Sequence, residues 1–403
     1  MSLFQVLKER TFALLWSGQT ASRLGDSLYR IALSWWVLQK TGSATTMGAV
    51  LIFSFTPQLI FLLIGGAVAD RFPRMRLMFA SDILRGVLVA IVALLAALDT
   101  LQVWHILLAS VVFGFVDAFF QPAYAAIMPE IVPAELLNGA NSLSSLSGQL
   151  SGVVGPALGA FIIQSGGTSL GFALDSASFF IAALCVLPML RPKITEDYHK
   201  PEDGILSGIK DGLLTVRNSP WLWITILVFG FANVTTAGPM AVALPFLVKN
   251  TLRADVNVLG LILSANAVGS IVGTIGMGLF KKMHRRGLIA YGASILFALM
   301  LVVTGLTISV AVLLAAGFVF GIGMSIFGMI WVKSVQDIVP LEKLGRVFSV
   351  DMLGSFVLLP IGFGISGWLT DRIPASTVFI LGGGLSIVMF LAALLHPAIR
   401  EFD

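Results

Sequence analysis

The chain has 403 residues, of which 57% are apolar and only 11% are Asp, Glu, Lys or Arg. Soluble domains carry roughly 25% charged residues, so this composition excludes water as the main solvent around the protein. The net charge of +4 comes from basic residues dispersed over short loops, which argues against nucleic-acid binding. One cysteine, Cys185, and four scattered histidines leave no disulfide framework and no ligand-spaced pair, so we expect neither a metal nor a cofactor.

Apolar segments long enough to span a bilayer core as helices, about 20 residues each, recur along the whole chain. They predict an all-α membrane protein surrounded by lipid. We expect twelve transmembrane helices, at residues 12–38, 45–69, 77–98, 104–128, 138–165, 169–190, 221–248, 256–280, 287–308, 310–333, 347–370 and 375–395.

The segment 191–220 is polar and charged, in contrast to the short links elsewhere. It divides the chain into two six-helix bundles, 1–190 and 221–403. Apolar residues between positions 205 and 216 recur at helical spacing, which predicts a short amphipathic helix on the membrane surface. We therefore expect a cytoplasmic linker between two bundles.

The distribution of Lys and Arg predicts the orientation of the chain. With the N-terminus in the cytoplasm, 18 of the 25 basic residues fall on the cytoplasmic side and four on the outer side. The other three, Arg23, Arg30 and Arg85, fall within the predicted spans. This bias favours a multi-pass protein of the plasma membrane with both termini in the cytoplasm and no cleavable signal peptide.

The two halves resemble each other at an offset of 207 residues. Ile131-Val132-Pro133 matches Ile338-Val339-Pro340, and Glu135 matches Glu342. A parallel repeat of this kind is typical of transporters whose halves are related by pseudo-symmetry. The alternative is chance matching in apolar sequence.

Several motifs then sharpen this picture. Residues 65–76 (GGAVADRFPRMR) resemble the loop 2–3 motif of the major facilitator superfamily, and residues 155–160 (GPALGA) resemble its antiporter motif. The runs 23–27, 120–123 and 129–133 are similar to the drug/proton antiporter branch, which includes macrolide efflux proteins.

The resemblance covers essentially the whole chain and implies the major facilitator fold, in which helices 1, 4, 7 and 10 line a central cavity. It also implies a monomer that works by alternating access. One departure concerns helix 4, where many proton-coupled members have an Arg shortly before a Gly. Here Ser110-Val111-Val112-Phe113 precedes Gly114, so other residues must handle any proton.

Helix 1 carries a polar stripe at helical spacing. It consists of Gln19, Ser22, Arg23, Asp26, Ser27, Arg30 and Ser34. A charge at mid-bilayer costs about 2.5–3.5 kcal/mol on insertion scales, so three charges on one face imply a water-filled cavity or internal pairing. Asp26 can pair with Arg23 or Arg30 one turn away. We place Gln19, Arg23 and Arg30 in the substrate cavity; a purely structural ion-pair ladder is the alternative.

Asp117 lies near the middle of helix 4, with Gln121 and Tyr124 further along the same face. Asp26 has two basic neighbours on its own helix and Asp117 has none, which favours Asp117 as the group that exchanges a proton. We assign proton coupling to Asp26 and Asp117, and substrate contact to Gln121 and Tyr124. The alternative is that Asp117 is a fixed partner of Arg23 or Arg30.

Other charged residues within the spans receive structural interpretations. Asp82 and Arg85 form an i, i+3 pair in helix 3, and Asp175 and Asp351 are interpreted as helix-end or interface residues.

The second half contributes uncharged cavity residues, namely Asn233 and Thr236 in helix 7 and Ser325 in helix 10.

The antiporter-like motif supplies Gly155, Pro156 and Gly159 in helix 5. A proline removes a backbone donor and small residues allow close helix approach, so we expect these residues to shape the helix rather than contact substrate.

The loops on the cytoplasmic side predict a gate. Loop 2–3 carries Asp70, Arg71 and Arg74, whereas loop 4–5 carries Glu130 and Glu135 without a basic residue. The second half repeats this contrast. Opposite charges in loops on the same side suggest ion-pair latches that hold the inner face shut. The alternative is that they only set topology.

These observations favour a secondary-active exporter of bulky amphipathic small molecules, exchanging them for protons. A lipid or lysolipid flippase and proton-coupled uptake of a small solute remain alternatives. We do not expect an enzyme, because the G-x-S-x-G match at residues 167–171 lacks the preceding strand that a nucleophile elbow requires. Neither H-E-x-x-H nor a Walker A motif occurs.

Overall fold

The computed structural model describes residues 3–69, 71–190, 205–280 and 283–403. The regular structure in these ranges is helical, as predicted. The long helices of the first half are α1 (Arg10–Thr41), α2 (Ala44–Ala69), α3 (Arg74–Ala97), α4 (Val103–Ile131) and α5 (Leu137–Val186). The helices of the second half are α6 (Ile205–Arg217), α7 (Pro220–Gly238), α8 (Leu244–Phe246), α9 (Val256–Gly278), α10 (Arg286–Leu306), α11 (Val310–Ile338), α12 (Leu344–Phe356), α13 (Leu359–Thr370), α14 (Ala375–Leu394) and α15 (Pro397–Arg400).

The number of membrane spans follows from two of these helices. Ten segments of the described chain are long and apolar enough to cross a bilayer. One of them contains α5, whose backbone leaves the helical region at Gly167 (φ 78°), so its 50 residues form two consecutive helices. The ten do not include α1, because polar and charged residues interrupt its 32 residues. Counting both segments of α5 and adding α1 gives the twelve predicted spans.

Prolines explain two irregular helices in the second half. The helix that begins with α7 continues through wide turns at Pro239–Ala243 and Leu247–Thr251, with α8 between them. A further span is divided into α12 and α13, and Pro360 stands in the first turn of α13. Proline lacks a backbone N–H and clashes with the preceding turn, which widens or breaks a helix at such positions.

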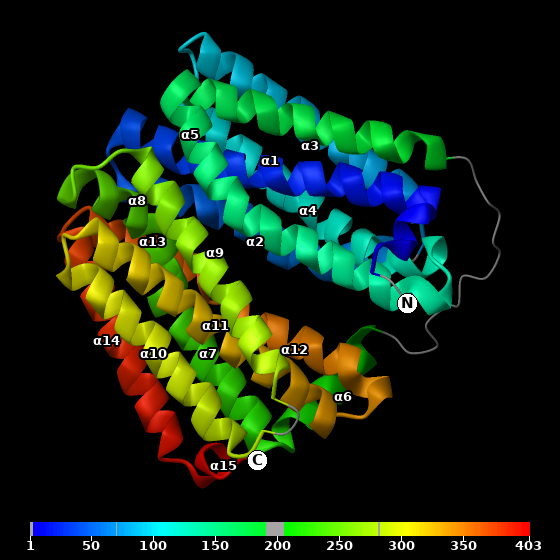
Figure 1. Ribbon diagram of the computed structural model, residues 1–403, viewed down its shortest axis with the longest axis vertical. Coiled ribbons are helices and arrows are strands. Elements are labelled where there is room, and N and C mark those ends of the chain that lie inside the picture. Colours follow the sequence, from blue (N-terminus) through cyan, green and yellow to red (C-terminus); the bar gives the residue numbers. More distant parts are fainter. Residues whose placement is uncertain (1–2, 70, 191–204, 281–282) are drawn as a thin grey trace. The chain divides into compact units, whose positions relative to one another are not determined.

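The described chain forms two compact units. Unit 1 comprises Met1–Gly42, Ala49–His199 and Asp255–Gly260. Within it, α1 and α3 pack along α5 (Figure 1). Large apolar side chains such as Phe12 and Met78 are fully buried at the end where α3 begins.

Unit 2 comprises Ser43–Gly48, Lys200–Ala254 and Leu261–Asp403. Here α10 packs against α11 and α14, and α7 packs against α13 and α14 (Figure 1). Of the predicted linker, residues 191–204 lie outside the described residues.

The amphipathic segment of the linker, where the structure describes it, is α6, which packs against α12. Asp211 of α6 accepts hydrogen bonds from Lys343 and Arg346, each at 2.8 Å. These hydrogen bonds hold the pKa of the Asp211 carboxyl below its usual value.

Each unit includes a short segment from the other half of the sequence, and this segment contains the beginning of a helix. The start of α2 belongs to unit 2, where the Asp371 carboxylate accepts hydrogen bonds from Ser43 Oγ (2.8 Å) and from the backbone N–H groups of Ala44 (2.6 Å) and Thr45 (3.0 Å). Partial burial alone would raise the pKa of Asp371, but these hydrogen bonds outweigh it and lower the pKa.

The start of α9 belongs to unit 1 and is held differently. A Cβ atom at Gly260 would lie 2.5 Å from the Pro156 carbonyl oxygen and 2.6 Å from the Ala160 methyl carbon, both in α5. The absence of a side chain therefore allows this close approach.

Candidate functional site

Unit 1 encloses a polar cavity of about 300 Å³ between α1, α2, α3 and α4. Its charged and polar lining residues are Gln19, Ser22, Arg23, Asp26, Arg30, Ser54, Gln58, Arg85, Ser110, Asp117 and Gln121. Its aromatic lining residues are Tyr29, Phe55, Phe113, Phe120 and Tyr124. Charged groups beside aromatic faces, inside a membrane-spanning bundle, are the mark of a ligand site.

The structure brings together all the cavity and proton-coupling residues predicted in the first half. These are Gln19, Arg23, Asp26, Arg30, Asp117, Gln121 and Tyr124. They meet because α1 and α4 each present one polar stripe at helical spacing, and both stripes face the same space.

Arg23 ties α1 to two other helices. Its Nη1 donates to the Ser144 carbonyl oxygen (2.6 Å) and to Ser147 Oγ (3.1 Å), both in α5. Its Nη2 donates to the Tyr124 hydroxyl at 3.1 Å. Arg23 therefore uses its donors across helices, in place of the pairing with Asp26 that spacing along α1 allows.

Asp26 and Arg30 are more open to the cavity. The Arg30 Nη2 donates to Ser27 Oγ at 3.1 Å. Within the described part of the chain, neither residue forms an ion pair closer than 4.0 Å. The Asp26 carboxylate thus remains available to a ligand or a proton.

Arg85 of α3 is the central cation of the site, a role that the sequence interpretation of a structural pair with Asp82 did not anticipate. Its Nη2 lies 2.7 Å from Asp82 Oδ1 and its Nη1 lies 3.2 Å from Asp117 Oδ1. The guanidinium also lies over the rings of Phe120 (4.1 Å) and Phe179 (4.6 Å).

Asp117 therefore has a fixed basic partner, but it is Arg85 rather than Arg23 or Arg30. The sequence showed only the Asp82–Arg85 pair at i, i+3 spacing. It gave no sign of the contact between Arg85 and Asp117, because spacing along one helix does not reveal partners on another helix.

Gln19 links the ion pair to the cavity. Its Nε2 donates to Asp82 Oδ2 at 3.2 Å, while its side chain also lines the cavity. Asp82 is fully buried and receives donors on both carboxyl oxygens. It is thus a fully satisfied anchor for Arg85.

The cavity residues predicted in the second half lie in unit 2, and their hydrogen bonds go to helix backbones. Asn233 Nδ2 donates to the Ser355 carbonyl oxygen (2.8 Å), Thr236 Oγ1 to that of Ala232 (2.8 Å) and Ser325 Oγ to that of Ile322 (3.0 Å). No hydrogen bond among the described residues joins these three side chains to one another, so their part in a cavity stays a prediction.

The predicted gate residues are partly paired. Arg74 Nη1 forms an ion pair with Glu130, and both residues belong to unit 1. Arg71 and Glu135 are exposed, and Asp70 lies outside the described residues.

Unit 2 repeats the arrangement, because Arg286 Nη1 lies 2.6 Å from Asp337 Oδ2. Arg74 and Arg286 are the first residues of α3 and α10, and Glu130 and Asp337 are separated by the repeat offset of 207. Each pair joins the ends of two helices of the same unit.

The predicted helix-shaping residues lie where α5 meets α1. A Cβ atom at Gly155 would overlap the Ser27 side chain, and one at Gly159 would lie 3.2 Å from Leu28 Cα. The carbonyl oxygen of Pro156 lies close to Gly260, near the beginning of α9. Small residues therefore set the spacing of these helices, and none of the three lines the polar cavity.

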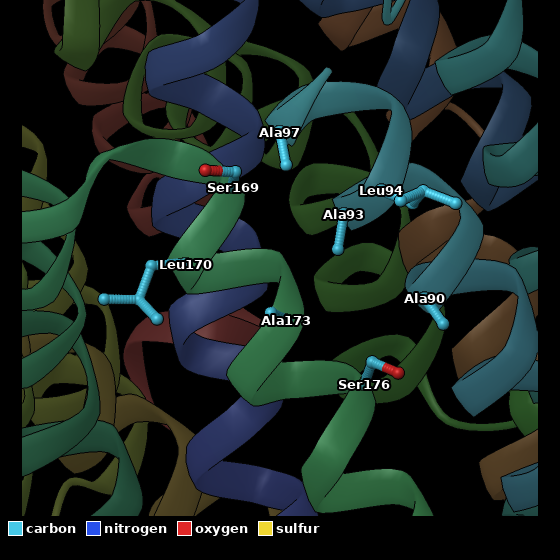
Figure 2. A pocket seen from close by; sticks show the side chains of 8 residues that line it. All are labelled: Ala90, Ala93, Leu94, Ala97, Ser169, Leu170, Ala173 and Ser176. Carbon is cyan, nitrogen blue, oxygen red and sulfur yellow. The ribbon is translucent and has the colours of Figure 1, made fainter. Parts of the chain in front are cut away.

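A second hollow of about 440 Å³ lies between α3 and the segment of α5 that follows Gly167. Figure 2 shows the alanines of α3 on one side and Ala173 with two serines on the other. Ser176 Oγ donates to the Gly86 carbonyl oxygen at 2.8 Å. With no ionisable group in its lining, this groove offers no chemistry comparable with that of the polar cavity.

The family model described as Major Facilitator Superfamily matches residues 15–350 and 236–401. The chain belongs to the major facilitator superfamily. The predicted family and the all-helical transporter fold are thereby confirmed.

Two relatives within the superfamily align with almost the whole chain. Macrolide efflux protein A of Streptococcus pyogenes is 23% identical over 400 residues, covering 97% of this chain and 97% of its own. Multidrug efflux pump Tap of Mycolicibacterium fortuitum is 27% identical over 405 residues, covering 97% of this chain and 96% of its own.

Solved structures share the fold at low identity. The nucleoside transporter NupG matches with a TM-score of 0.73 at 12% identity, covering 98% of this chain and 100% of its own. A bacterial homologue of the iron transporter ferroportin, in an inward-facing state, matches with a TM-score of 0.71 at 16% identity, covering 95% and 98%. At these identities the likeness concerns the fold alone.

Proposed function

We propose that this superfamily member exports bulky amphipathic small molecules across the plasma membrane by alternating access, in exchange for protons. The observation that carries the proposal is the cavity of unit 1, which places ionisable groups of α1, α3 and α4 beside aromatic rings. The alignment with two efflux proteins over their whole lengths supports export of drug-like compounds, including macrolides.

The lining of the cavity suits a ligand with one apolar and one polar part. Phe55, Phe113 and Tyr29 offer ring faces and edges to an apolar skeleton. Gln58 and Gln121 offer amide donors and acceptors to hydroxyl or amine groups. Such a lining selects on amphipathic character rather than on one fixed shape.

Asp117 is suited to exchange a proton because its partner is shared. When Asp117 takes up a proton, Arg85 keeps its pair with Asp82 at 2.7 Å and is not left as an unpaired buried charge. Asp26 lines the same cavity without an ion pair among the described residues, so a cationic ligand or a proton can neutralise it. Both carboxylates thus belong to the proposed coupling machinery.

The proposed orientation places both termini and the Arg74–Glu130 and Arg286–Asp337 pairs in the cytoplasm. Each pair ties two helix ends within one bundle, and the bundles, at about 1–190 and 221–403, move as bodies during alternating access. We propose that Arg71, Glu135 and Asp70 act at the same gate, and that the protein works as a monomer.

Proteoliposomes test this proposal. Purified protein is reconstituted with an imposed pH gradient, and uptake of a macrolide, of ethidium and of a fluorescent lysolipid is measured in parallel. Concentrative uptake of the macrolide or ethidium that collapses with the gradient supports drug/proton exchange. Movement of the lysolipid alone would indicate a flippase, and accumulation in the same direction as the protons would indicate uptake rather than export.

The variant Asp117→Asn isolates the coupling step. It should lose concentrative transport while retaining downhill exchange, because its amide cannot cycle a proton. Concentrative transport at the wild-type level by Asp117→Asn would remove Asp117 from the mechanism.

A further inference from the structure

Asp175 is a buried carboxyl group that the proposed mechanism does not use. It lies in the segment of α5 that follows Gly167, and its side chain is 0% exposed. Neither of its carboxyl oxygens has a hydrogen-bond partner among the described residues. The hydroxyl of Ser178 lies nearby but donates to the Asp175 main-chain carbonyl oxygen at 2.7 Å. An unsatisfied buried carboxyl of this kind requires an explanation.

A glycine brings this carboxyl close to the cavity wall. A Cβ atom at Gly25 of α1 would lie 2.6 Å from Asp175 Oδ1, so the missing side chain lets the two helices meet at this point. The next residue, Asp26, lines the cavity. Asp175 is therefore separated from the cavity by the backbone of α1.

The charged groups that act on Asp175 come from two helices. Asp26 and Arg30 of α1 and Arg85 of α3 interact with its charge. One of these three groups, Asp26, is another carboxylate.

The charges inside the spans of unit 1 do not balance if all groups are ionised. There are three arginines, Arg23, Arg30 and Arg85, and four aspartates, Asp26, Asp82, Asp117 and Asp175. Guanidinium groups keep their protons in proteins. One carboxyl group must therefore carry a proton for the interior to be neutral, since an uncompensated buried charge costs several kcal/mol.

Contacts identify which carboxyl group this is. Asp82 and Asp117 share Arg85, and Asp26 faces the polar cavity. Asp175 has neither a donor among the described residues nor access to the cavity. The proton is thus assigned to the one carboxyl group of the four that has neither a donor on its oxygens nor a place in the cavity lining.

We infer that Asp175 is a proton-binding site of this transporter, whose occupancy is set by the charge in the adjoining cavity. While Asp26 is ionised, repulsion between the two carboxylates keeps the proton on Asp175. When a cationic ligand enters beside Asp26, its positive charge disfavours the proton, which leaves Asp175 as the carboxylate and passes to water. The transport role rests on the proposed exchange with protons, whereas the protonation itself does not.

Infrared difference spectroscopy of the purified full-length protein in nanodiscs tests protonation directly. A protonated carboxyl group has a carbonyl stretch distinct from that of a carboxylate and shifts in D₂O. At pH about 7.5, where an ordinary Asp is ionised, the wild type should show such a band and Asp175→Asn should lose it completely. Asp351→Asn is the matched control, because Asp351 also lies within a span but belongs to unit 2 and leaves the charges inside unit 1 unchanged; it should keep the band.

Two results overturn the assignment. One is a wild-type spectrum without a protonated carboxyl band, and the other is the same band in wild type and Asp175→Asn. The amide of Asn resembles a neutral acid in shape, so this variant is expected to fold. Should it not fold, Asp175→Ser, which is smaller and also cannot ionise, gives the same readout.

Proton release tests the coupling to the cavity. Ethidium is added to the protein in weakly buffered solution with a pH indicator, and its Kd is measured separately. Asp175→Asn should release roughly one proton fewer per bound cation than the wild type, with a Kd within a few-fold. Equal release by both proteins overturns the coupling. If the infrared band is lost in Asp175→Asn but no compound is driven by a pH gradient, the proton site stands and the proposed antiport fails.

Discussion

The interiors of the two units are stabilised by different interactions. Unit 1 contains three arginines and four aspartates within its spans, and Arg85 pairs with two of the aspartates. Unit 2 instead contains a cluster of rings, which we call the aromatic cluster: Phe229, Tyr291, Phe297, Phe327 and Phe390. In this cluster Phe229 and Phe327 stack with centroids 3.7 Å apart and planes 13° apart.

A half-buried carboxyl group of unit 2 is also bound differently. Asp351 accepts hydrogen bonds from the Trp331 indole Nε1 (2.9 Å) and the Ser355 hydroxyl (2.8 Å). These are neutral donors, whereas Asp82 and Asp117 of unit 1 share the Arg85 guanidinium. The comparison suggests that two repeats of one fold have separated their tasks, with titratable chemistry in unit 1 and rigid apolar packing in unit 2.

The largest effect is expected from removing the central cation of unit 1. Arg85→Leu leaves Asp82 buried without its charged partner, which costs about 3–5 kcal/mol of unfolding free energy. Thermal unfolding in nanodiscs measures this loss. The double variant Arg85→Leu/Asp82→Asn should recover most of it, because it removes both charges. A loss below about 1 kcal/mol in the single variant would show that water solvates Asp82 in place of Arg85.

A smaller effect is expected from opening the aromatic cluster of unit 2. Phe390 is fully buried, and Phe390→Ala leaves a void that costs about 2 kcal/mol through lost packing. The water-transfer contribution is missing here, since lipid solvates apolar groups of separated helices as well. The control Leu391→Ala changes the next residue, which is 51% exposed, and should be nearly neutral. Equal losses in both variants would contradict a packed cluster.

The pH dependence of stability separates the two units further. The pKa values of Asp211 and Asp371 in unit 2 are lowered, so their contribution is present above the unfolded pKa of about 3.9 and is lost only as pH falls through the still lower folded value. Each of the variants Asp211→Asn and Asp371→Asn should therefore lower Tm by an amount that stays the same from about pH 5 to pH 8. If the Tm difference between wild type and either variant changed sharply within this range, that carboxyl group of unit 2 would titrate there, which contradicts its lowered pKa.

The smallest effects are expected where the two units are alike. Arg74→Gln and Arg286→Gln each break one half-exposed ion pair, worth about 0–1 kcal/mol. The two losses should be equal and should shrink together at high salt, because exposed pairs are screened. If only one variant lost a large part of its unfolding free energy, the two ion pairs would not play equivalent roles in the two repeats.

Much of this molecule was predictable because a bilayer constrains helices strongly. Apolar length predicted the spans, and the polar stripe of helix 1 includes five residues that line the cavity, although its Ser27 and Ser34 do not. Opposite charges in loops 2–3 and 4–5 likewise predicted ion pairs, and Arg74 does form an ion pair with Glu130. In each case the signal lay in the length, spacing or charge of individual segments.

What escaped prediction lies between helices. Arg85 was interpreted as a partner of Asp82 alone, since nothing along α3 indicates that Asp117 of α4 lies 3.2 Å away. Arg23 was placed within reach of Asp26, but its donors go to α5 and α4. Asp175 was interpreted as an interface residue, and only the missing side chain of Gly25 reveals its position behind the cavity. Contacts of this kind depend on how helices rotate about their axes, which periodicity does not determine.

The three hydrogen bonds that Asp371 accepts from Ser43, Ala44 and Thr45 have a consequence for expressing the protein as two fragments. A cut within the linker would leave the carboxylate on one fragment and all three of its donors on the other. The same cut would separate Gly260 from the α5 backbone it approaches. Two separately produced fragments would each lack a helix start that completes a compact unit. Split versions of this protein should therefore mature only when both fragments are made in the same cell.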